Sequence, residues 1–314
     1  MNRRQFLPRC LGAVALLPAV NSTAAAPSQL EQLLDAGQRL LQEHVDPSAL
    51  AAIRSGDPSA IEGWLKQAMS VLQEDQVLEL ADLEDVAKAV LPILESQPRT
   101  RGYASWLKSR MDYFQVADFF RDRAPAPPVA PGQPAPGLPN PTPSQERKAW
   151  ERQVASQPAS KGAASWVSKL KPVFKQAGAP SELVWLAEIE SSFDPQARSP
   201  AGAAGMYQLM PKTAEGLGLK LQPQDERLVP EKSARASATY LRQTYRQFKD
   251  WRLALAGYNA GPGKVADLLK RRRATSFDAV APSLPAETQM YVPKLEAVLQ
   301  QREKVALTSL RLPA

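Results

Sequence analysis

The stretch SELVWLAEIESSFDPQARSPAGAAGMYQLMPKTAEGLG, residues 181–218, is the part of the chain that best defines its fold. It begins as a predicted helix. Ser181 is a candidate N-cap, and Glu182 lies in the first turn, where the helix dipole favours a negative charge. The pair Asp194-Pro195 predicts the end of this helix, because a residue before proline resists the helical conformation.

Glu190 lies on the apolar face of that predicted helix. At helical spacing, Leu183, Leu186 and Ala187 share one face with Glu190 in their midst, whereas Glu188 points away from it. Burial raises the pKa of a carboxyl group and keeps it protonated near neutral pH, as general acid catalysis requires. Taken alone, the pattern also fits a structural carboxylate held in a buried ion pair.

The residues that follow differ in kind, because residues 198–206 are mostly small. Gly202 and Gly205 allow tight backbone turns and the close approach of a ligand to the main chain. Met210-Pro211 then opens another short predicted helix. A helix that carries a buried carboxyl group and is followed by a loop of small residues predicts a binding site beside Glu190.

Further motifs follow these in a fixed order. They are Glu190-Ser191, Ser199, Gly202-Ala203-Ala204-Gly205, Met206 to Pro211, Thr213-Ala214, Gly257-Tyr258-Asn259-Ala260-Gly261-Pro262-Gly263, and Glu287 to Val292. This set resembles the catalytic domain of soluble lytic transglycosylases, which is similar to goose-type lysozyme. The sequence departs mildly from the family pattern at positions 206 and 207, and at Gly257, where the family usually has Ala.

The resemblance implies a lyase that cleaves the β-1,4 bond between N-acetylmuramic acid and N-acetylglucosamine in peptidoglycan and leaves a 1,6-anhydro end. It implies a single catalytic carboxyl group, Glu190, with no metal and no organic cofactor. Its implied substrate-binding residues are Ser199, Met206 (through its main chain), Gln208, Tyr258, Asn259 and Tyr291. Ser191 is expected to make a local structural bond.

Two other functions fit the same motifs. A lysozyme-type hydrolase on this scaffold needs a second carboxylate, for which Asp194 is the nearest candidate, although ending the helix is its simpler role. A non-catalytic wall-binding or assembly protein could keep the groove, but an intact Glu190 argues against it. Chemistry based on a histidine or cysteine is excluded in effect, because the chain has one His (His44) and one Cys (Cys10).

Residues 1–26 have the features of a signal peptide: a charged start, a short apolar run and small residues at the end. Arg3-Arg4 fits twin-arginine export as well as ordinary Sec export. Loss of three arginines (Arg3, Arg4 and Arg9) lowers the formal charge from +7 to 7 − 3 = +4. We expect a periplasmic or extracytoplasmic protein without a transmembrane segment in its mature chain, which binds glycan strands and not nucleic acid.

The remaining chain predicts an all-α protein with two helical domains. Residues 27–123 form a helical N-terminal domain of unknown role, which could bind a protein partner. Residues 124–143 contain nine prolines and predict a linker that leaves the orientation of its neighbours free. Residues 144–314 form the lysozyme-like domain. Predicted helices include 77–94, 103–121, one from Val229-Pro230 to Phe248, and one from Pro285 to about Val305.

Overall fold

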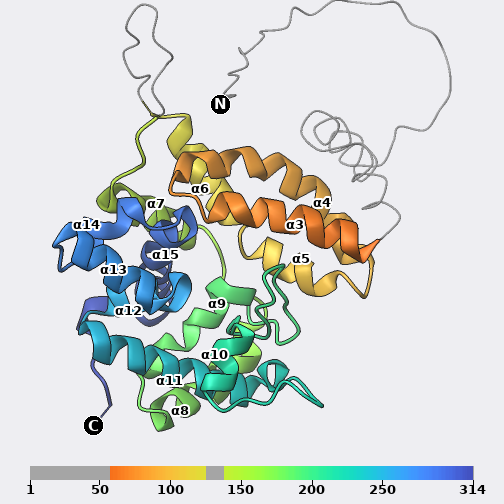
Figure 1. Ribbon diagram of the computed structural model, residues 1–314, viewed down its shortest axis with the longest axis vertical. Helices are drawn as coiled ribbons and strands as arrows, with labels where there is room; N and C mark the ends of the chain where they lie inside the picture. The colour runs from red at the N-terminus through yellow and green to blue at the C-terminus, as the bar shows by residue number, and fades with distance from the viewer. Residues whose placement is uncertain (1–56, 125–137, 314) are drawn as a thin grey trace, which may run out of the picture.

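The computed structural model describes residues 57–124 and 138–313 (Figure 1). The expected signal segment 1–26, the start of the N-terminal domain (27–56) and most of the linker (125–137) lie outside the described residues. The α-helices are α3 (Pro58–Leu72), α4 (Glu84–Ser96), α5 (Arg101–Lys108), α6 (Met111–Arg121), α7 (Pro143–Ala155), α8 (Ala163–Gln176), α9 (Leu186–Ser191), α10 (Pro211–Gly216), α11 (Pro230–Phe248), α12 (Trp251–Ala260), α13 (Pro262–Arg272), α14 (Phe277–Val280) and α15 (Ala286–Glu303).

The described residues also contain five short 3₁₀ helices, and the prediction of an all-α protein is confirmed. They are η1 (Val77–Leu83), η2 (Ser181–Trp185), η3 (Glu226–Leu228), η4 (Ala281–Ser283) and η5 (Leu307–Ser309). Within residues 57–124 and 138–313 no strand forms, and the β-type pairing is limited to two isolated bridges, Arg198 with Ala204 and Ala204 with Leu209. In the same residues, no helix combines the length and the apolar character needed to cross a bilayer.

Helix starts follow the local signals in the sequence. Asp57 caps α3 by accepting a hydrogen bond from the Ser59 amide, with Pro58 at the first helical position. Asp250 caps α12 in the same way, through the Leu253 amide at 2.9 Å. Helix α11 has the predicted bounds, and α15 starts after Pro285 as predicted.

The stretch of residues 181–218 folds differently from its prediction. It begins as the 3₁₀ helix η2, and Ser181 makes no capping bond, because its hydroxyl donates to the Glu182 carboxylate. The α-helix α9 then ends at Ser191, before Asp194. Ser192 and Phe193 adopt left-handed conformations (φ 55° and 62°), which reverse the chain and bury the Phe193 ring against Trp185.

The predicted helix 103–121 is two helices, α5 and α6, with a break at Ser109 and Arg110. Hydrogen bonds to distant parts of the chain account for the break. The Ser109 carbonyl oxygen accepts from the Lys294 ammonium at 3.0 Å, and Arg110 donates to the Glu190 carbonyl oxygen in α9. The predicted helix 77–94 also begins late, with its first turns in the 3₁₀ helix η1.

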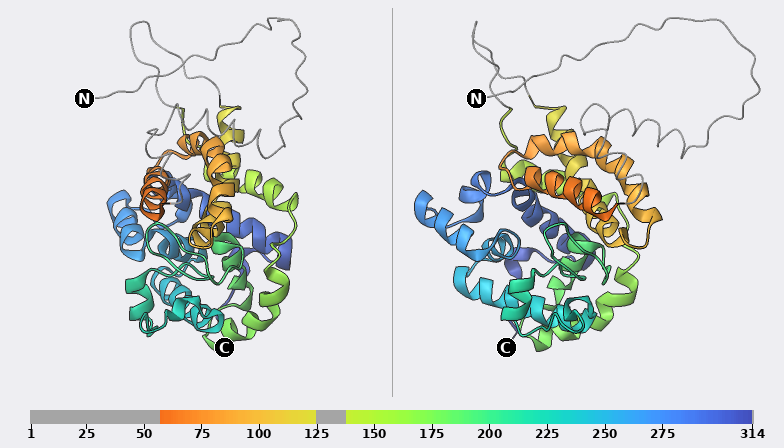
Figure 2. Two further views of the ribbon diagram at one scale, coloured as in Figure 1. Left: turned by 90° about the vertical axis from the view of Figure 1, so that its right-hand side faces the viewer. Right: turned by 45° about the vertical axis from the view of Figure 1, so that its right-hand side comes forward.

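Helices α3 to α6 lie against the C-terminal helices, with α5 packed on α9 and α6 packed on α7 (Figures 1 and 2). One continuous apolar core runs from Leu65 in α3 to Leu310. At the junction, the rings of Tyr113 and Trp150 meet edge to face at 5.2 Å, and the Lys294 ammonium lies over both. The expectation of a free orientation is therefore wrong for α3 to α6. The division into domains at the linker stays a prediction.

Candidate active site

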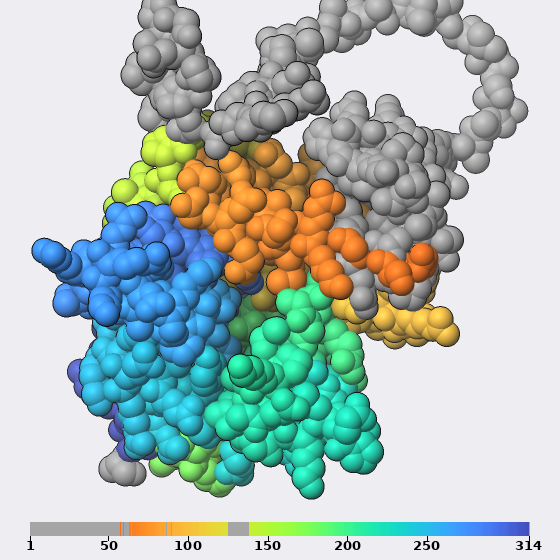
Figure 3. All heavy atoms as spheres, viewed as in Figure 1, coloured from red at the N-terminus to blue at the C-terminus, as the bar shows by residue number. Residues whose placement is uncertain are grey.

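A pocket of about 350 Å³ opens near the middle of the molecule, where α3, the C-terminal helices and the loop before α10 meet (Figure 3). Its walls come from both parts of the chain. Met69, Gln73, Trp106 and Arg110 contribute from the N-terminal helices. The other walls come from α9, the loop of residues 198–210, and helices α10, α11, α12 and α15.

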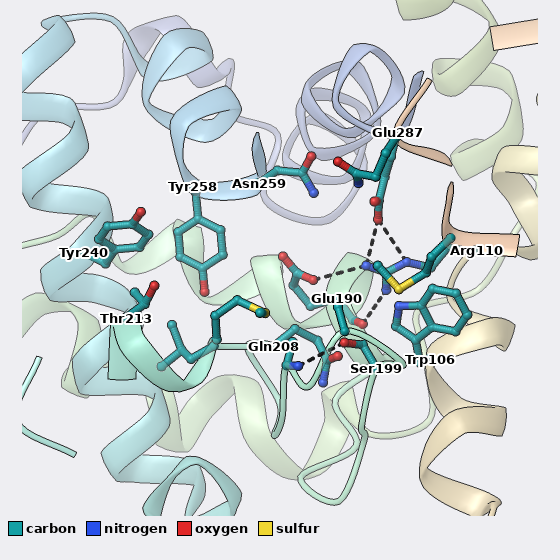
Figure 4. Close-up of a pocket in the computed structure, with 16 residues that line it drawn as sticks. Trp106, Arg110, Glu190, Ser199, Gln208, Thr213, Tyr240, Tyr258, Asn259 and Glu287 are labelled. Atoms are coloured by element: carbon teal, nitrogen blue, oxygen red, sulfur yellow. Dashed lines mark hydrogen bonds and ion pairs between the residues drawn. The ribbon is translucent and has the colours of Figure 1, made fainter. Parts of the chain in front are cut away.

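Glu190 lies at the centre of this pocket (Figure 4). It belongs to the last turn of α9, and only 4% of its surface is exposed. Its Oε1 atom accepts a hydrogen bond from the Tyr291 hydroxyl at 2.6 Å. Burial raises the pKa of Glu190 to about 7, against the opposing influence of Arg110 and the Tyr291 hydroxyl. The carboxyl group is therefore available as an acid near neutral pH, as its place on the apolar face predicts.

Arg110 and Glu287 are site residues that the sequence analysis missed. Arg110 donates to the Glu190 carbonyl oxygen from Nη1 at 2.8 Å, and its Nη2 lies 3.5 Å from Glu190 Oε2. Its Nε and Nη2 donate to Glu287 Oε1 at 3.1 and 2.9 Å. Glu287 belongs to the motif Glu287 to Val292, so the sequence offered a signal for it as a site residue. Arg110 lies 80 residues before Glu190, and no local pattern identifies it.

The loop of residues 198–210 supplies Ser199 and Gln208. The Ser199 hydroxyl accepts from the Ala203 amide at 3.0 Å. Gln208 is held in a left-handed conformation (φ 46°), uncommon for a residue other than glycine. Its Nε2 donates to the Ala197 and Gly205 carbonyl oxygens at 3.2 and 2.8 Å. Its Oε1 is buried and has no hydrogen-bond partner among the described residues, so it can accept a hydrogen bond from a bound ligand.

Tyr258 and Asn259 form the wall opposite Trp106 and Arg110 (Figure 4). The Tyr258 hydroxyl donates to the Tyr207 carbonyl oxygen at 2.7 Å and lies 2.9 Å from the Ser237 hydroxyl. Asn259 Oδ1 accepts from the Thr288 hydroxyl, and this bond orients the amide group at the pocket edge. The structure thus brings Ser199, Gln208, Tyr258 and Asn259 together around Glu190.

Met206 and Tyr291 do not line the pocket. Both are completely buried. The Met206 carbonyl accepts from the Ser191 hydroxyl at 2.8 Å, which confirms the structural bond expected of Ser191. Tyr291 reaches the site only through its bond to Glu190.

Two carboxyl groups line the pocket, those of Glu190 and Glu287, and Glu190 makes the longer of the two contacts with Arg110. Asp194 lies outside the lining, where it accepts hydrogen bonds from the Ser105 hydroxyl and the Gln196 amide. Glu287 lies in the lining but is the close ion-pair partner of Arg110. Within the described ranges, no group of three or more His, Cys, Asp or Glu side chains is arranged to hold a metal ion. This arrangement suits proton transfer by a single acid to a polar ligand.

The central part of the chain is similar to known proteins. Residues 171–280 match the family model described as the transglycosylase SLT domain. Membrane-bound lytic murein transglycosylase D from Escherichia coli is 37% identical over 143 residues, which are 44% of this chain and 32% of that protein. Soluble lytic murein transglycosylase from Salmonella typhimurium is 40% identical over 116 residues, which are 34% of this chain and 18% of that protein.

The chain spans no more than about a third of the length of these relatives. Among solved structures, the 70 kDa soluble lytic transglycosylase from Escherichia coli aligns with a TM-score of 0.39 and 19% identity. That alignment covers 90% of this chain and 58% of the other.

Proposed function

We propose that this chain is a lytic transglycosylase, a lyase that cleaves the glycan strands of peptidoglycan, because its residues 171–280 match the family model described as the transglycosylase SLT domain. The observation that supports this proposal most directly is Glu190, a buried carboxyl group with a pKa of about 7 at the centre of the pocket. The relatives named above carry this activity in their names. The stretch that matches the family model, residues 171–280, contains Glu190 and the loop of residues 198–210.

In the proposed reaction, Glu190 acts first as an acid and then as a base. Its proton passes to the glycosidic oxygen as the bond to the anomeric carbon of N-acetylmuramic acid breaks. The resulting carboxylate takes the proton of the 6-hydroxyl group of the same sugar, whose oxygen bonds to the anomeric carbon. The product has a 1,6-anhydro end, and no water is consumed. An intramolecular nucleophile has a high effective concentration, so no second carboxylate is needed to activate water.

The hydrogen bonds around Glu190 suit these two steps. The Tyr291 hydroxyl donates to Oε1, so the transferable proton belongs on Oε2. We infer that Ser199, Gln208, Tyr258 and Asn259 contact the substrate, with Gln208 Oε1 accepting from a sugar hydroxyl or amide group. Met206 and Tyr291 act indirectly, by holding the loop and the carboxyl group.

We also propose that residues 1–26 direct export, so that the protein meets peptidoglycan outside the cytoplasm. A mildly basic mature chain suits an anionic cell-wall setting. No cofactor is invoked in this mechanism, and every proton transfer is assigned to Glu190.

The test is product analysis by mass spectrometry, with residues 27–314 and purified peptidoglycan in ¹⁸O-labelled water. We expect anhydro-muropeptides without the label. Labelled reducing ends would instead identify a hydrolase, and the absence of products would favour a wall-binding protein.

The Glu190→Gln variant keeps the size of the side chain but removes the transferable proton. We expect a loss of at least about 10²-fold in product release, the lower end for general acid catalysis. Glu182→Gln is the matched control, because it makes the same chemical change in the preceding helix and outside the pocket lining. Equal turnover by Glu190→Gln and wild type would refute the assignment.

A further inference from the structure

Arg110 reaches the catalytic carboxyl group from a part of the chain that precedes the SLT domain. It lies at the break between α5 and α6, and 4% of its surface is exposed. Its guanidinium group points between Glu190 and Glu287 (Figure 4). A buried charge is tolerated only where its donors are satisfied, and here Nε, Nη1 and Nη2 all have acceptors.

One of these contacts fixes the backbone of Glu190. The carbonyl groups in the last turn of a helix have no partner within that helix. The Glu190 carbonyl oxygen instead accepts from Arg110 Nη1 at 2.8 Å and from the Ser109 hydroxyl at 3.2 Å. The positive guanidinium also complements the negative end of the α9 dipole. The junction of α5 and α6 therefore fixes the backbone of Glu190, and with it the position of the Glu190 side chain.

The other contacts form a buried cluster of two carboxyl groups and one guanidinium. With both carboxyl groups ionised, this cluster carries a net charge of −1, whereas with one of them protonated it is neutral. Burial favours the neutral arrangement. Glu287 makes the two shorter contacts to Arg110, at 2.9 and 3.1 Å, while Glu190 Oε2 lies 3.5 Å away. Glu287 thus serves as the counter-ion, and the proton belongs on Glu190.

We propose that Arg110 is a positioning residue for Glu190 and that its ion pair with Glu287 keeps Glu190 in the acid form. This inference rests on the proposed function, in which that acid form starts the reaction. It makes α5 and α6 part of the catalytic apparatus, because they supply the cation that orients the carboxyl group.

Other titratable groups near Glu190 do not supply this control. Tyr291 donates to Glu190, and the charge of Glu190 also acts on Tyr258 and Tyr113. Burial raises the pKa of all three hydroxyl groups well above the usual value for tyrosine. They remain neutral through the pH range in which Glu190 titrates, so the charges that change its proton affinity are Arg110 and Glu287.

The test measures product release against pH for two variants, Glu287→Gln and Arg110→Gln, in each of which an uncharged side chain replaces a charged one. In wild type, activity falls above about pH 7, because the acid form of Glu190 is lost. In Glu287→Gln, Glu190 becomes the sole counter-ion of Arg110, so the midpoint of this fall moves down by at least about one pH unit, a tenfold loss on the alkaline side. In Arg110→Gln the midpoint of this fall moves to higher pH. The maximal rate falls as well, because the Glu190 carbonyl oxygen loses its hydrogen bond from Arg110.

A residue with only a structural role would lower the rate at every pH without moving the midpoint. Glu296→Gln is the matched control, because it removes a carboxylate of the same helix from its ion pair with Arg252, outside the pocket. Its midpoint should equal that of wild type. Thermal melting checks folding, and if Arg110→Gln does not fold, the downward shift in Glu287→Gln decides the question alone. An unchanged midpoint in Glu287→Gln overturns the proposal.

A second readout separates this inference from the proposed function. The carboxyl carbon of Glu190 can be titrated by ¹³C NMR and identified as the signal missing in Glu190→Gln. Opposite displacements of its titration in the two variants, with no product from any form, would support the role of the ion pair and refute the lytic activity. Titrations that coincide in all forms would overturn the inference, whatever the activity.

Discussion

Glu190 carries a carboxyl group that folding removes almost entirely from water. The pKa of a glutamate of this kind rises from 4.5 to about 7 on folding, with burial as the main cause. The folded protein therefore binds the proton more tightly than the unfolded chain. The contribution of Glu190 to folding stability is greatest below about pH 4.5. It decreases as the pH rises toward 7, because Glu190 loses its proton in the unfolded chain before it does so in the folded protein. The same burial that prepares the acid thus destabilises the fold at neutral and alkaline pH.

This opposition predicts that Glu190→Gln stabilises the protein as it inactivates it. The neutral amide has no proton to lose, so the variant should gain up to about 3 kcal/mol over wild type between about pH 5 and pH 8. Urea unfolding at the two pH values measures this gain. Glu182→Gln serves as the control and should show no such trend. A stability difference that does not change with pH would contradict the assignment of a raised pKa.

At the scale of elements, the loop of residues 198–210 is held by contacts from a distant arginine. Arg227 Nη1 donates to the carbonyl oxygens of Gly202 and Leu209 at 2.8 and 2.9 Å. The Arg227 backbone also lies against Gly205, where an added Cβ would come within 1.8 Å of its carbonyl oxygen. Gly205 has φ of +81°, so it meets both a conformational and a steric requirement.

Gly202 and Gly205 offer a matched pair of substitutions in this loop. Gly202 has φ of +88°, but no atom lies within 4 Å of its added Cβ. Gly202→Ala should therefore cost about 1–2 kcal/mol of stability, from the left-handed conformation alone. Gly205→Ala must also displace the backbone at Arg227, and we expect a cost above about 3 kcal/mol together with a loss of activity. Chemical unfolding and product release measure the two effects. Equal costs at the two positions would contradict this account of the loop.

At the scale of the whole molecule, the N-terminal helices α3 to α6 and the helices from α7 onward share one core. The main cluster of buried apolar residues extends from α3 to the C-terminal residues, and hydrogen bonds and an ion pair cross the same junction. The Gln289 amide donates to the Asp75 carbonyl oxygen at 2.8 Å, and Lys294 pairs with Asp112 at 2.8 Å. Separation of the two parts would expose apolar surface and leave these buried groups without partners.

We therefore expect residues 57–313 to unfold in a single cooperative transition. Far-UV circular dichroism, tryptophan fluorescence and calorimetry should give the same midpoint. Hydrogen exchange should protect amides of α4 and α6 to the same degree as those of α12 and α15. An earlier, separate transition of α3 to α6 would contradict a shared core, and it would also weaken the case for Arg110 as part of the catalytic site.

The features that the sequence determined by itself are local or periodic. Asp57 and Asp250 cap helices because a side chain and an amide two or three residues away are enough for that bond. The burial of Glu190 follows from its place among apolar residues at helical spacing. Gln208 and Tyr258 were identified by resemblance, and the fold places both around the pocket.

Tertiary structure alone decided how these parts meet. Helix α9 stops at Ser191 because burial of Phe193 requires a reversal of the chain, which no helix-end signal announces. The helix predicted through Arg110 breaks because that guanidinium finds its acceptors in residues 80 and 177 positions away. Periodicity shows which face of a helix is buried, but not which charge will lie opposite it. That choice depends on the packing of the whole chain, and here it determines the environment of the Glu190 carboxyl group.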